Sequence, residues 1–268
     1  DAVIICTPTD LHAQQIERFA RAGKAIFCEK PIDLDSARVR ACLDVVDKTG
    51  ATLMVGFNRR FDPHFMAVKA AIEFGRIGTP EMGIITSRDP GAPPSDYIIH
   101  SGGIFKDMMI HDFDMAVFLM SSMPQAVMAT GSVLTDRSIE ALGDFDSASA
   151  VLRWADGRQL LISNSRRASY GYDQRVELHG SLGMVAAENE HPVRIEVATA
   201  SGYMRPPLHE FFMSRYIAAY SNEINAFISV VGGEVVSIPT GIDGLNALLI
   251  AEAALESATT GRTVNIPK

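Results

Sequence analysis

Charged side chains within an otherwise apolar segment, SGGIFKDMMIHDFD at residues 101–114, are the first candidates for chemistry in this sequence. We expect one helix from about residue 102 to residue 120, apolar on most of its circumference and therefore buried. Burying an unpaired charge is costly, so each charged residue in such a helix needs a partner or a function. The acidic residues and the histidine of the segment are Asp107, His111, Asp112 and Asp114.

The spacing of these residues indicates an acid–base pair. Asp107 and His111 are four residues apart and Asp114 follows three later, so all three would share one helical face while Asp112 points elsewhere. Two glycines before them would let a ligand or another backbone approach closely. A carboxylate beside an imidazole on such a face is suited to proton transfer.

Two other interpretations of the segment stay open at this point. The Asp–His pair could be ordinary hydrogen bonding in a protein core. One histidine and two aspartates could also bind a divalent ion, but the second His or Cys that a zinc site requires is not nearby. We therefore rank a metal site last and expect none.

Composition restricts the class of protein. The chain has 268 residues, of which 47% are hydrophobic, enough for one large domain or two ordinary ones. Its net charge of −8 argues against nucleic acid or an anionic membrane as the main partner. We find no signal peptide and no apolar run of membrane-spanning length. Three cysteines without CxxC spacing indicate reduced, structural thiols and a cytoplasmic location.

Strands and helices alternate at the start of the chain. This alternation predicts a parallel sheet with right-handed crossovers, and we interpret it as the C-terminal half of a Rossmann-type, doubly wound fold. The apolar runs are short and are separated by turn residues and amphipathic segments. The predicted strands are 2–6, 25–28 and 52–57, and the predicted helices are 11–22 and a second one that Asp33 or Asp35 caps.

The other half of such a fold is missing from this sequence. It would carry a G-x-G-x-x-G turn and an acidic residue for the ribose, and no such glycine motif occurs in the 268 residues. The strand at 2–6 is apolar on both faces and must be covered on both. We expect the native polypeptide to carry roughly 60–70 further residues, about two βα units, before Asp1. The alternative is that the protein binds no dinucleotide.

After residue 59 the pattern changes to an α+β domain, so we divide the chain at 1–59 and 60–268. Consecutive strands flanked by helices predict an open, mostly antiparallel sheet, whose uncovered face would favour homo-oligomers. A proline-rich stretch, 90–103, is expected to be a loop. The expected helices are 63–74, 208–231 and 241–259, and the expected strands are 81–89, 125–134, 147–154, 158–165, 174–180, 193–198 and 263–266.

Several short motifs make the chain resemble the Gfo/Idh/MocA family of NAD(P)-dependent oxidoreductases. The resemblance covers the whole chain, and its details are closest to family members that act on inositol. The motifs are Thr7-Pro8-x-x-x-His12, Glu29-Lys30-Pro31, GFNRRF at 56–61, Asp107-x-x-x-His111 and Tyr170-Gly-Tyr172-Asp173.

The resemblance implies roles for individual residues. It implies NAD as cofactor, with NADP possible, a cyclic polyol such as myo-inositol as substrate, and a homotetramer. The implied catalytic residues are Lys30, Asp107 and His111. The implied substrate-binding residues are Asn58, Arg59, Asp89 and Tyr172. The implied cofactor-binding residues are Thr7, Pro8, His12, Glu29 and Lys30.

The residue types fit alcohol oxidation. A neutral imidazole at His111 could take the hydroxyl proton, Asp107 could orient it, and Lys30 could stabilise the developing alkoxide. Plainer interpretations are a Lys30–Glu29 surface pair and loop ion pairs for Arg59 and Asp89. Other hypotheses are a dehydrogenase of the same family acting on another sugar or inositol isomer, and a protein of this fold that senses a sugar or nucleotide without catalysis.

Overall fold

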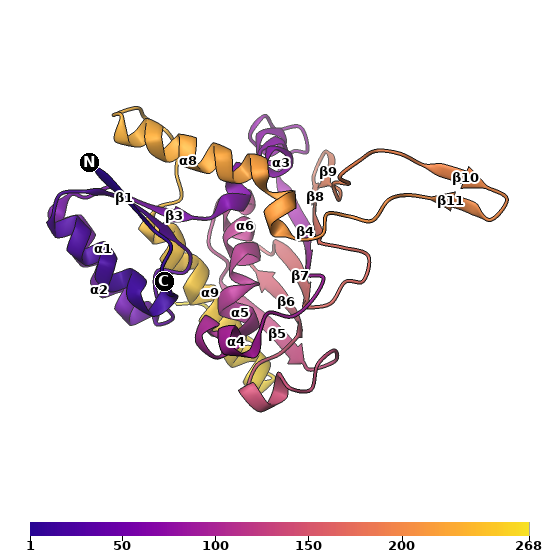
Figure 1. Ribbon diagram of the computed structural model, residues 1–268, viewed down its shortest axis with the longest axis horizontal. Coiled ribbons are helices and arrows are strands. Elements are labelled where there is room, and N and C mark those ends of the chain that lie inside the picture. Colours follow the sequence, from indigo (N-terminus) through magenta and orange to yellow (C-terminus); the bar gives the residue numbers. More distant parts are fainter. Residues whose placement is uncertain (268) are drawn as a thin grey trace.

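The first part of the chain forms a three-stranded parallel sheet in the computed structural model, which describes residues 1–267 (Figure 1). The strand order is β1-β2-β3, and the two crossovers are helical, as the alternating sequence pattern predicts. Its elements are β1 (Ala2–Ile5), η1 (Thr9–Leu11), α1 (His12–Arg21), β2 (Ala25–Glu29), α2 (Ser36–Thr49) and β3 (Leu53–Gly56).

The central strand of this sheet is covered on both faces. Ile26 and Cys28 point into the main core, whereas Phe27 lies in a separate cluster with Phe227 of α8 (Ile217–Val231), at 5.8 Å between ring centroids. Strand β1 lies at the edge of the sheet, and its Ile4 is 57% exposed. The continuous apolar run of β2 therefore reflects helices on two sides.

A seven-stranded sheet forms the second layer. Its order is β12-β5-β6-β7-β4-β8-β9, and every neighbouring pair is antiparallel except β4 and β7. The fold expected from the sequence is confirmed. The strands are β4 (Pro80–Arg88), β5 (Ala126–Ser132), β6 (Ser147–Arg153), β7 (Gln159–Ser165), β8 (Asp173–Gly180), β9 (Gly183–Ala187) and β12 (Val264–Asn265).

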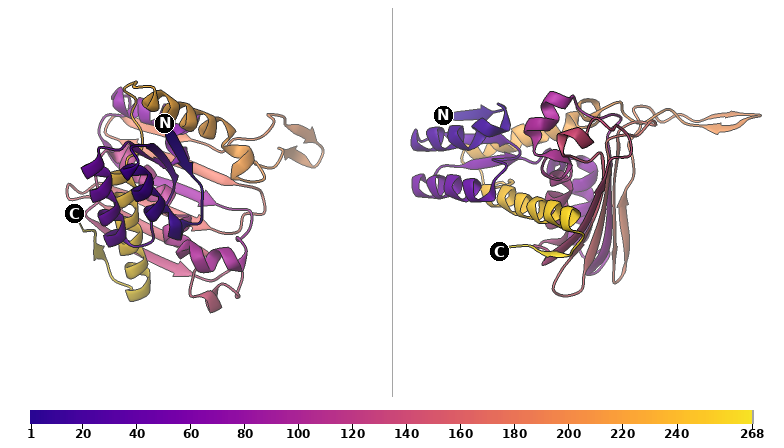
Figure 2. Two further views of the ribbon diagram at one scale, coloured as in Figure 1. Left: turned by 60° about the vertical axis from the view of Figure 1, so that its left-hand side comes forward. Right: turned by 90° about the horizontal axis from the view of Figure 1, so that it is seen from below.

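Within residues 1–267, helices cover only one face of the large sheet, as the right-hand view of Figure 2 shows. In β6 the alternation is clear: Leu152 is 0% exposed and faces the helices, whereas Val151 is 37% exposed on the outer face. The covering helices include α6 (Ile110–Met120) and α9 (Gly241–Thr260). Among residues 1–267, no helix has the length and apolar character needed to cross a bilayer.

The single helix expected over residues 102–120 is wrong. The segment forms α4 (Ser95–Ser101), α5 (Gly103–Asp107) and α6, and α4 lies inside the stretch expected to be a proline-rich loop. Gly102 ends α4 with a left-handed backbone at φ 82°. Between α5 and α6, the Met109 N–H donates to the carbonyl of Ile104, five residues back, at 2.8 Å. That wider turn interrupts the regular i to i−4 pattern.

Two further boundaries differ from the sequence-based expectation. The helix expected over 208–231 is divided into α7 (Phe212–Arg215) and α8. The strand expected at 193–198 does not join the large sheet; β10 (Val197–Thr199) pairs with β11 (Gly202–Met204) in an arm that stands away from the body (Figure 1). The remaining elements are η2 (Asn58–Phe61), α3 (Pro63–Glu73) and η3 (Glu140–Leu142).

Candidate active site

The carboxyl ends of the three parallel strands bring several of the predicted cofactor residues to one edge of the sheet. Thr7 and Pro8 follow β1, and Glu29 is the last residue of β2. The Glu29 carboxylate lies against β3, since a Cβ added at Gly56 would be 2.9 Å from its Oε2. Burial raises the pKa of Glu29, and the neighbouring Lys30 opposes that rise. Ligands of open α/β sheets bind at this edge.

His12 holds two turns of this edge together. Its side chain is 2% exposed, its Nδ1 lies 2.8 Å from the carbonyl oxygen of Pro31, and its Nε2 lies 2.7 Å from that of Thr7. Both ring nitrogens therefore face backbone carbonyls, and the nitrogen that carries the proton donates a hydrogen bond. His12 fixes the turns after β1 and β2 relative to one another, which supports the site indirectly.

Lys30 and Asp107 form the centre of the site, although they are distant in sequence. Lys30 follows β2 of the parallel sheet, and Asp107 is the last residue of α5. The Lys30 ammonium donates to Oδ1 of Asp107 at 3.0 Å and to its backbone carbonyl at 2.7 Å. The side chains are 13% and 14% exposed, so the pair is largely removed from water. Tyr97 of α4 also donates its hydroxyl to Oδ1, at 2.8 Å. The Glu29 pairing considered for Lys30 is thus replaced by a contact with Asp107 of α5.

His111 is half-buried beside this pair, and its Nδ1 is shielded from solvent. Burial lowers its pKa well below the ordinary value, and the positive charges of Lys30 and Arg59 lower it further. Its ring meets that of Phe57 edge to face at 6.3 Å, and its Nδ1 has no hydrogen-bond partner within residues 1–267. The imidazole is therefore neutral near pH 7 and able to accept a proton.

The expected shared face of Asp107, His111 and Asp114 is wrong. Asp107 ends α5 while the other two belong to α6, and the wider turn between the helices changes their relative orientation. Asp107 pairs with Lys30, and Asp114 accepts two hydrogen bonds from Arg60, at 2.9 and 2.5 Å. Asp114 is thus a partner for a buried arginine.

Arg59 is held by Asp112, which sequence spacing had set aside. The Arg59 Nη1 lies 2.5 Å from Oδ1 of Asp112, and both residues are at most 5% exposed. Asp112 also accepts from the Ser87 hydroxyl at 2.6 Å and from the Asn164 amide at 2.8 Å. Three donors thus compensate the burial of this carboxylate. The plain ion-pair interpretation of Arg59 therefore holds for one side of its guanidinium.

The other predicted substrate residues surround Arg59. Asn58 precedes it in η2 and is 5% exposed. Burial raises the pKa of Asp89 to about 6 against the lowering effect of Arg59. Burial likewise raises the pKa of Tyr172 well above its ordinary value, so its hydroxyl stays protonated. The Tyr172 ring packs against Tyr216 at 5.8 Å. Hydroxyl, amide, carboxyl and guanidinium groups thus gather beside Lys30 and His111.

Sequence reasoning missed three residues of this cluster. Tyr97 lies in the stretch expected to be a proline-rich loop, Arg166 stands in a pair of basic residues at 166–167, and Tyr216 stands in the segment RYIAAY at 215–220. All three become relevant through contacts between residues distant in sequence. A buried aromatic or arginine in a polar segment is a weak signal on its own.

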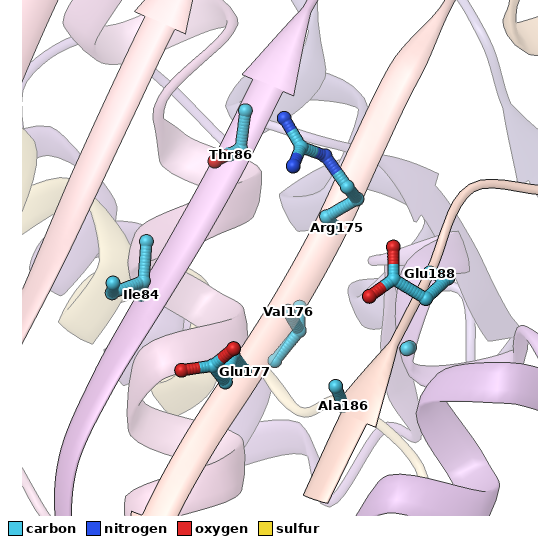
Figure 3. Close-up of a pocket in the computed structure, with 8 residues that line it drawn as sticks. Ile84, Thr86, Arg175, Val176, Glu177, Ala186 and Glu188 are labelled. Atoms are coloured by element: carbon cyan, nitrogen blue, oxygen red, sulfur yellow. The ribbon is translucent and has the colours of Figure 1, made fainter.

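The hollow in Figure 3 lies on the opposite side of the large sheet from this cluster. Thr86 and Arg175 point into it, whereas the next residue of β4, Ser87, faces Arg59 on the inner side. It encloses about 140 Å³ and contains no part of the Lys30 cluster. No group of three or more His, Cys, Asp or Glu side chains within residues 1–267 is arranged to hold a metal ion.

Comparison with known families agrees with both halves of the fold. Residues 1–57 match the family described as "Oxidoreductase family, NAD-binding Rossmann fold", and residues 65–186 match "GFO/IDH/MocA C-terminal domain". Together these matches extend over more than half of the chain.

Individual relatives are similar along almost the whole chain. An inositol 2-dehydrogenase of Rhizobium meliloti (strain 1021) is 64% identical over 266 residues, which are 99% of this chain and 81% of that protein. The crystal structure of a myo-inositol dehydrogenase from Corynebacterium glutamicum is 43% identical with a TM-score of 0.94, covering 100% of this chain and 80% of that one. That of scyllo-inositol dehydrogenase from Lactobacillus casei, with bound NAD(H) and scyllo-inositol, is 30% identical with a TM-score of 0.92, covering 99% and 80%.

Fold, sequence matches and the half-buried Lys–Asp–His cluster at the edge of the parallel sheet agree with one another. The chain belongs to the Gfo/Idh/MocA family of oxidoreductases.

Proposed function

We propose that this protein catalyses the NAD-dependent oxidation of a secondary alcohol of myo-inositol to the corresponding ketone, 2-keto-inositol. The observation that carries the proposal is the largely water-shielded Lys30–Asp107 pair, with side chains 13% and 14% exposed, beside a neutral His111. The substrate is inferred from the relatives, among which the inositol 2-dehydrogenase of Rhizobium meliloti is 64% identical.

His111 is the proposed base. Oxidation of an alcohol removes a proton from oxygen and a hydride from carbon, and a neutral imidazole can accept the proton. The low pKa of His111 keeps it in that form at neutral pH. NAD, when bound, supplies the acceptor for the hydride.

Lys30 is proposed to stabilise the oxygen from which the proton leaves. Its ammonium is held by the carboxylate and the backbone carbonyl of Asp107, which fixes its position. A preorganised positive charge at a developing alkoxide lowers the barrier without reorganisation during the reaction. Asp107 in this arrangement orients Lys30 directly, and any effect on the tautomer of His111 is secondary.

The residues at the sheet edge fit the nicotinamide half of NAD. The backbone approaches closely at Gly56, beside the Glu29 carboxylate, and Thr7 and Pro8 form the turn after β1. His12 holds that turn to Pro31. We propose that Thr7, Pro8 and Glu29 border the cofactor, with Lys30 between cofactor and substrate.

The polyol is proposed to contact Asn58, Arg59, Asp89 and Tyr172. Arg59 and a protonated Tyr172 provide donors, and Asp89 provides an acceptor whose charge changes near pH 6. Several donors and acceptors are needed because each ring carbon of an inositol carries a hydroxyl. A site built to hydrogen-bond hydroxyls rejects analogues that lack them.

The direct test is reduction of NAD by purified full-length protein with myo-inositol, followed by absorbance of the reduced nicotinamide. Lys30→Ala and His111→Ala should each lower kcat by at least about 10²-fold with folding nearly intact. Lys48→Ala and His64→Ala, which change a lysine and a histidine outside the cluster, serve as controls. If either active-site variant kept wild-type turnover with every accepted polyol, that residue's role would be abandoned.

The same assay separates the remaining alternatives. Comparing myo- and scyllo-inositol tests the isomer, since one similar structure contains scyllo-inositol. Replacing NAD with NADP tests the cofactor. Binding of a sugar or nucleotide without any turnover would favour the sensing hypothesis over the enzyme.

We also propose a homotetramer built on the outer face of the large sheet. That face carries exposed apolar side chains, including Ile84, Met128 and Leu161 at 47%, 58% and 40% exposure. The separate β10–β11 arm is a two-stranded hairpin, which is marginally stable alone. Contiguous exposed apolar surface is typical of subunit contacts. Sedimentation that showed a stable monomer at micromolar concentration would contradict this proposal.

Two smaller proposals concern location and domain division. Cys6, Cys28 and Cys42 are unpaired thiols, which supports a cytoplasmic location. A division at 59/60 is supported by the end of β3 at Gly56, although α9 contacts elements on both sides. Cell fractionation tests the first and limited proteolysis the second.

A further inference from the structure

A buried arginine behind the active site has no role in the mechanism described so far. Arg166 follows β7, and its side chain is only 1% exposed. Its Nη1 donates to Oδ2 of Asp144 at 2.8 Å, and its Nη2 lies 3.8 Å from Oδ2 of Asp107. That Nη2 has no hydrogen-bond partner within residues 1–267. One buried guanidinium is therefore shared between two carboxylates.

The two carboxylates lie at opposite ends of the same short helix, α5. Oδ1 of Asp144 accepts a hydrogen bond from the Ile104 N–H at 2.8 Å, at the start of α5, and Asp107 is the last residue of α5. The contact at the start is close, because a Cβ added at Gly103 would be 2.5 Å from Asp144 Oδ1. Arg166 thus links the large sheet to both ends of the helix that presents Asp107.

The two oxygens of Asp107 have different partners. Oδ1 accepts from Lys30 at 3.0 Å and from Tyr97 at 2.8 Å, whereas Oδ2 faces Arg166. The guanidinium therefore favours the rotamer in which Oδ1 points toward Lys30. Its charge also compensates a site that contains several carboxylates, and it lowers the pKa of Asp89, which burial raises to about 6.

We propose that Arg166 is a positioning residue, which fixes α5 through Asp144 and turns the Asp107 carboxylate toward Lys30. This inference rests on the proposed dehydrogenase function. It gives a role to a residue that lies behind Asp107 and outside the sequence motifs on which the family resemblance rests. A planar guanidinium suits this place because its rigid fork of donors holds two carboxylates in a fixed relative geometry, whereas an ammonium is a point charge on a flexible stem.

The test compares Arg166→Met and Arg166→Lys with the wild type, and uses Arg215→Met as a matched control. Arg215 is also buried and paired with a carboxylate, Asp62 at 2.6 Å, but it does not contact Asp107. Arg166→Met should lower kcat/KM by about 10²-fold, as expected for a misplaced catalytic group. In this variant the acidic limb of the pH profile of kcat/KM should move to higher pH, because the pKa of Asp89 loses the positive charge that lowers it. Arg166→Lys keeps the positive charge, so the acidic limb should stay at the wild-type pH. Its kcat/KM should lie between the values of the wild type and Arg166→Met.

A second measurement needs no turnover and so separates this inference from the proposed function. The rate of Lys30 acetylation by acetic anhydride, followed by mass spectrometry, should rise about fivefold or more in Arg166→Met, since a hydrogen bond to a charged group is worth at least that factor. It should not change in Arg215→Met. Unchanged Lys30 labelling in Arg166→Met, or equal changes in both variants, would overturn the inference. If Arg166→Met does not fold, wild-type kcat/KM in Arg166→Lys overturns it.

Discussion

Replacing Asp112 with alanine should strongly destabilise the protein. Asp112 is 0% exposed and accepts hydrogen bonds from Arg59, Ser87 and Asn164, which come from η2, β4 and β7. In the Asp112→Ala variant, the guanidinium of Arg59 would stay buried without its counter-ion, and two polar side chains would lose their acceptor. Breaking a buried ion pair from one side is costly because the remaining charge is uncompensated.

The expected loss follows from this geometry. Removing one partner of a buried pair costs about 3–5 kcal/mol, which corresponds to a fall in Tm of about 6–20 °C for a chain of this size. Changing both partners, as in Arg59→Met with Asp112→Ala, should recover part of that loss, since no charge is then left buried. Stability is compared here independently of activity, because Arg59 is also a proposed substrate ligand.

Urea unfolding at one fixed protein concentration measures the effect, and an unchanged m-value confirms that the midpoint reports stability. Asp156→Ala is the matched control: Asp156 also accepts from an arginine, Arg158 at 2.8 Å, but its side chain is 56% exposed. That variant should leave the midpoint unchanged within error. A loss below about 1 kcal/mol for Asp112→Ala, or a double variant no more stable than the single one, would refute the reasoning.

Two further predictions concern a buried carboxyl group and a glycine. Glu223 is 0% exposed, its carboxyl oxygens have no partner within residues 1–267, and burial raises its pKa to about 9. Its stabilising contribution should be complete below about pH 4.5 and lost as pH rises through 9. Glu223→Gln should therefore be more stable than the wild type at pH 8–9 by on the order of a few kcal/mol in urea unfolding, and an unchanged pH dependence would contradict this. Gly103→Ala should cost about 2 kcal/mol more than Gly143→Ala, because both have positive φ, 78° and 71°, but only the first Cβ would collide, with Asp144. Equal midpoints for the two glycine variants would show that the collision is relieved.

Local sequence determined most of the elements and the identity of the central chemistry. The alternation of apolar strands and amphipathic helices over residues 1–57 predicted the parallel sheet, since periodicity and turn residues are local signals. Consecutive strands flanked by helices predicted an open sheet with one uncovered face, and β6 shows the corresponding alternation of buried and exposed residues. Asp107 and His111 could be singled out because charged residues are unusual in a segment that reads as buried, whereas Lys30 was named through the family resemblance of Glu29-Lys30-Pro31.

Tertiary structure decided which charges are paired. The sequence placed Asp107 with His111 and left Asp112 aside, whereas the fold pairs Asp107 with Lys30, 77 positions away, and Asp112 with Arg59, 53 positions away. Helix periodicity assumes regular turns, and one backbone bond from Met109 to Ile104 was enough to break the shared face. The place of Arg166 behind Asp107 likewise depends on how β7 meets α5. Such contacts join segments that are distant in sequence, so the spacing of residues within one segment cannot predict them.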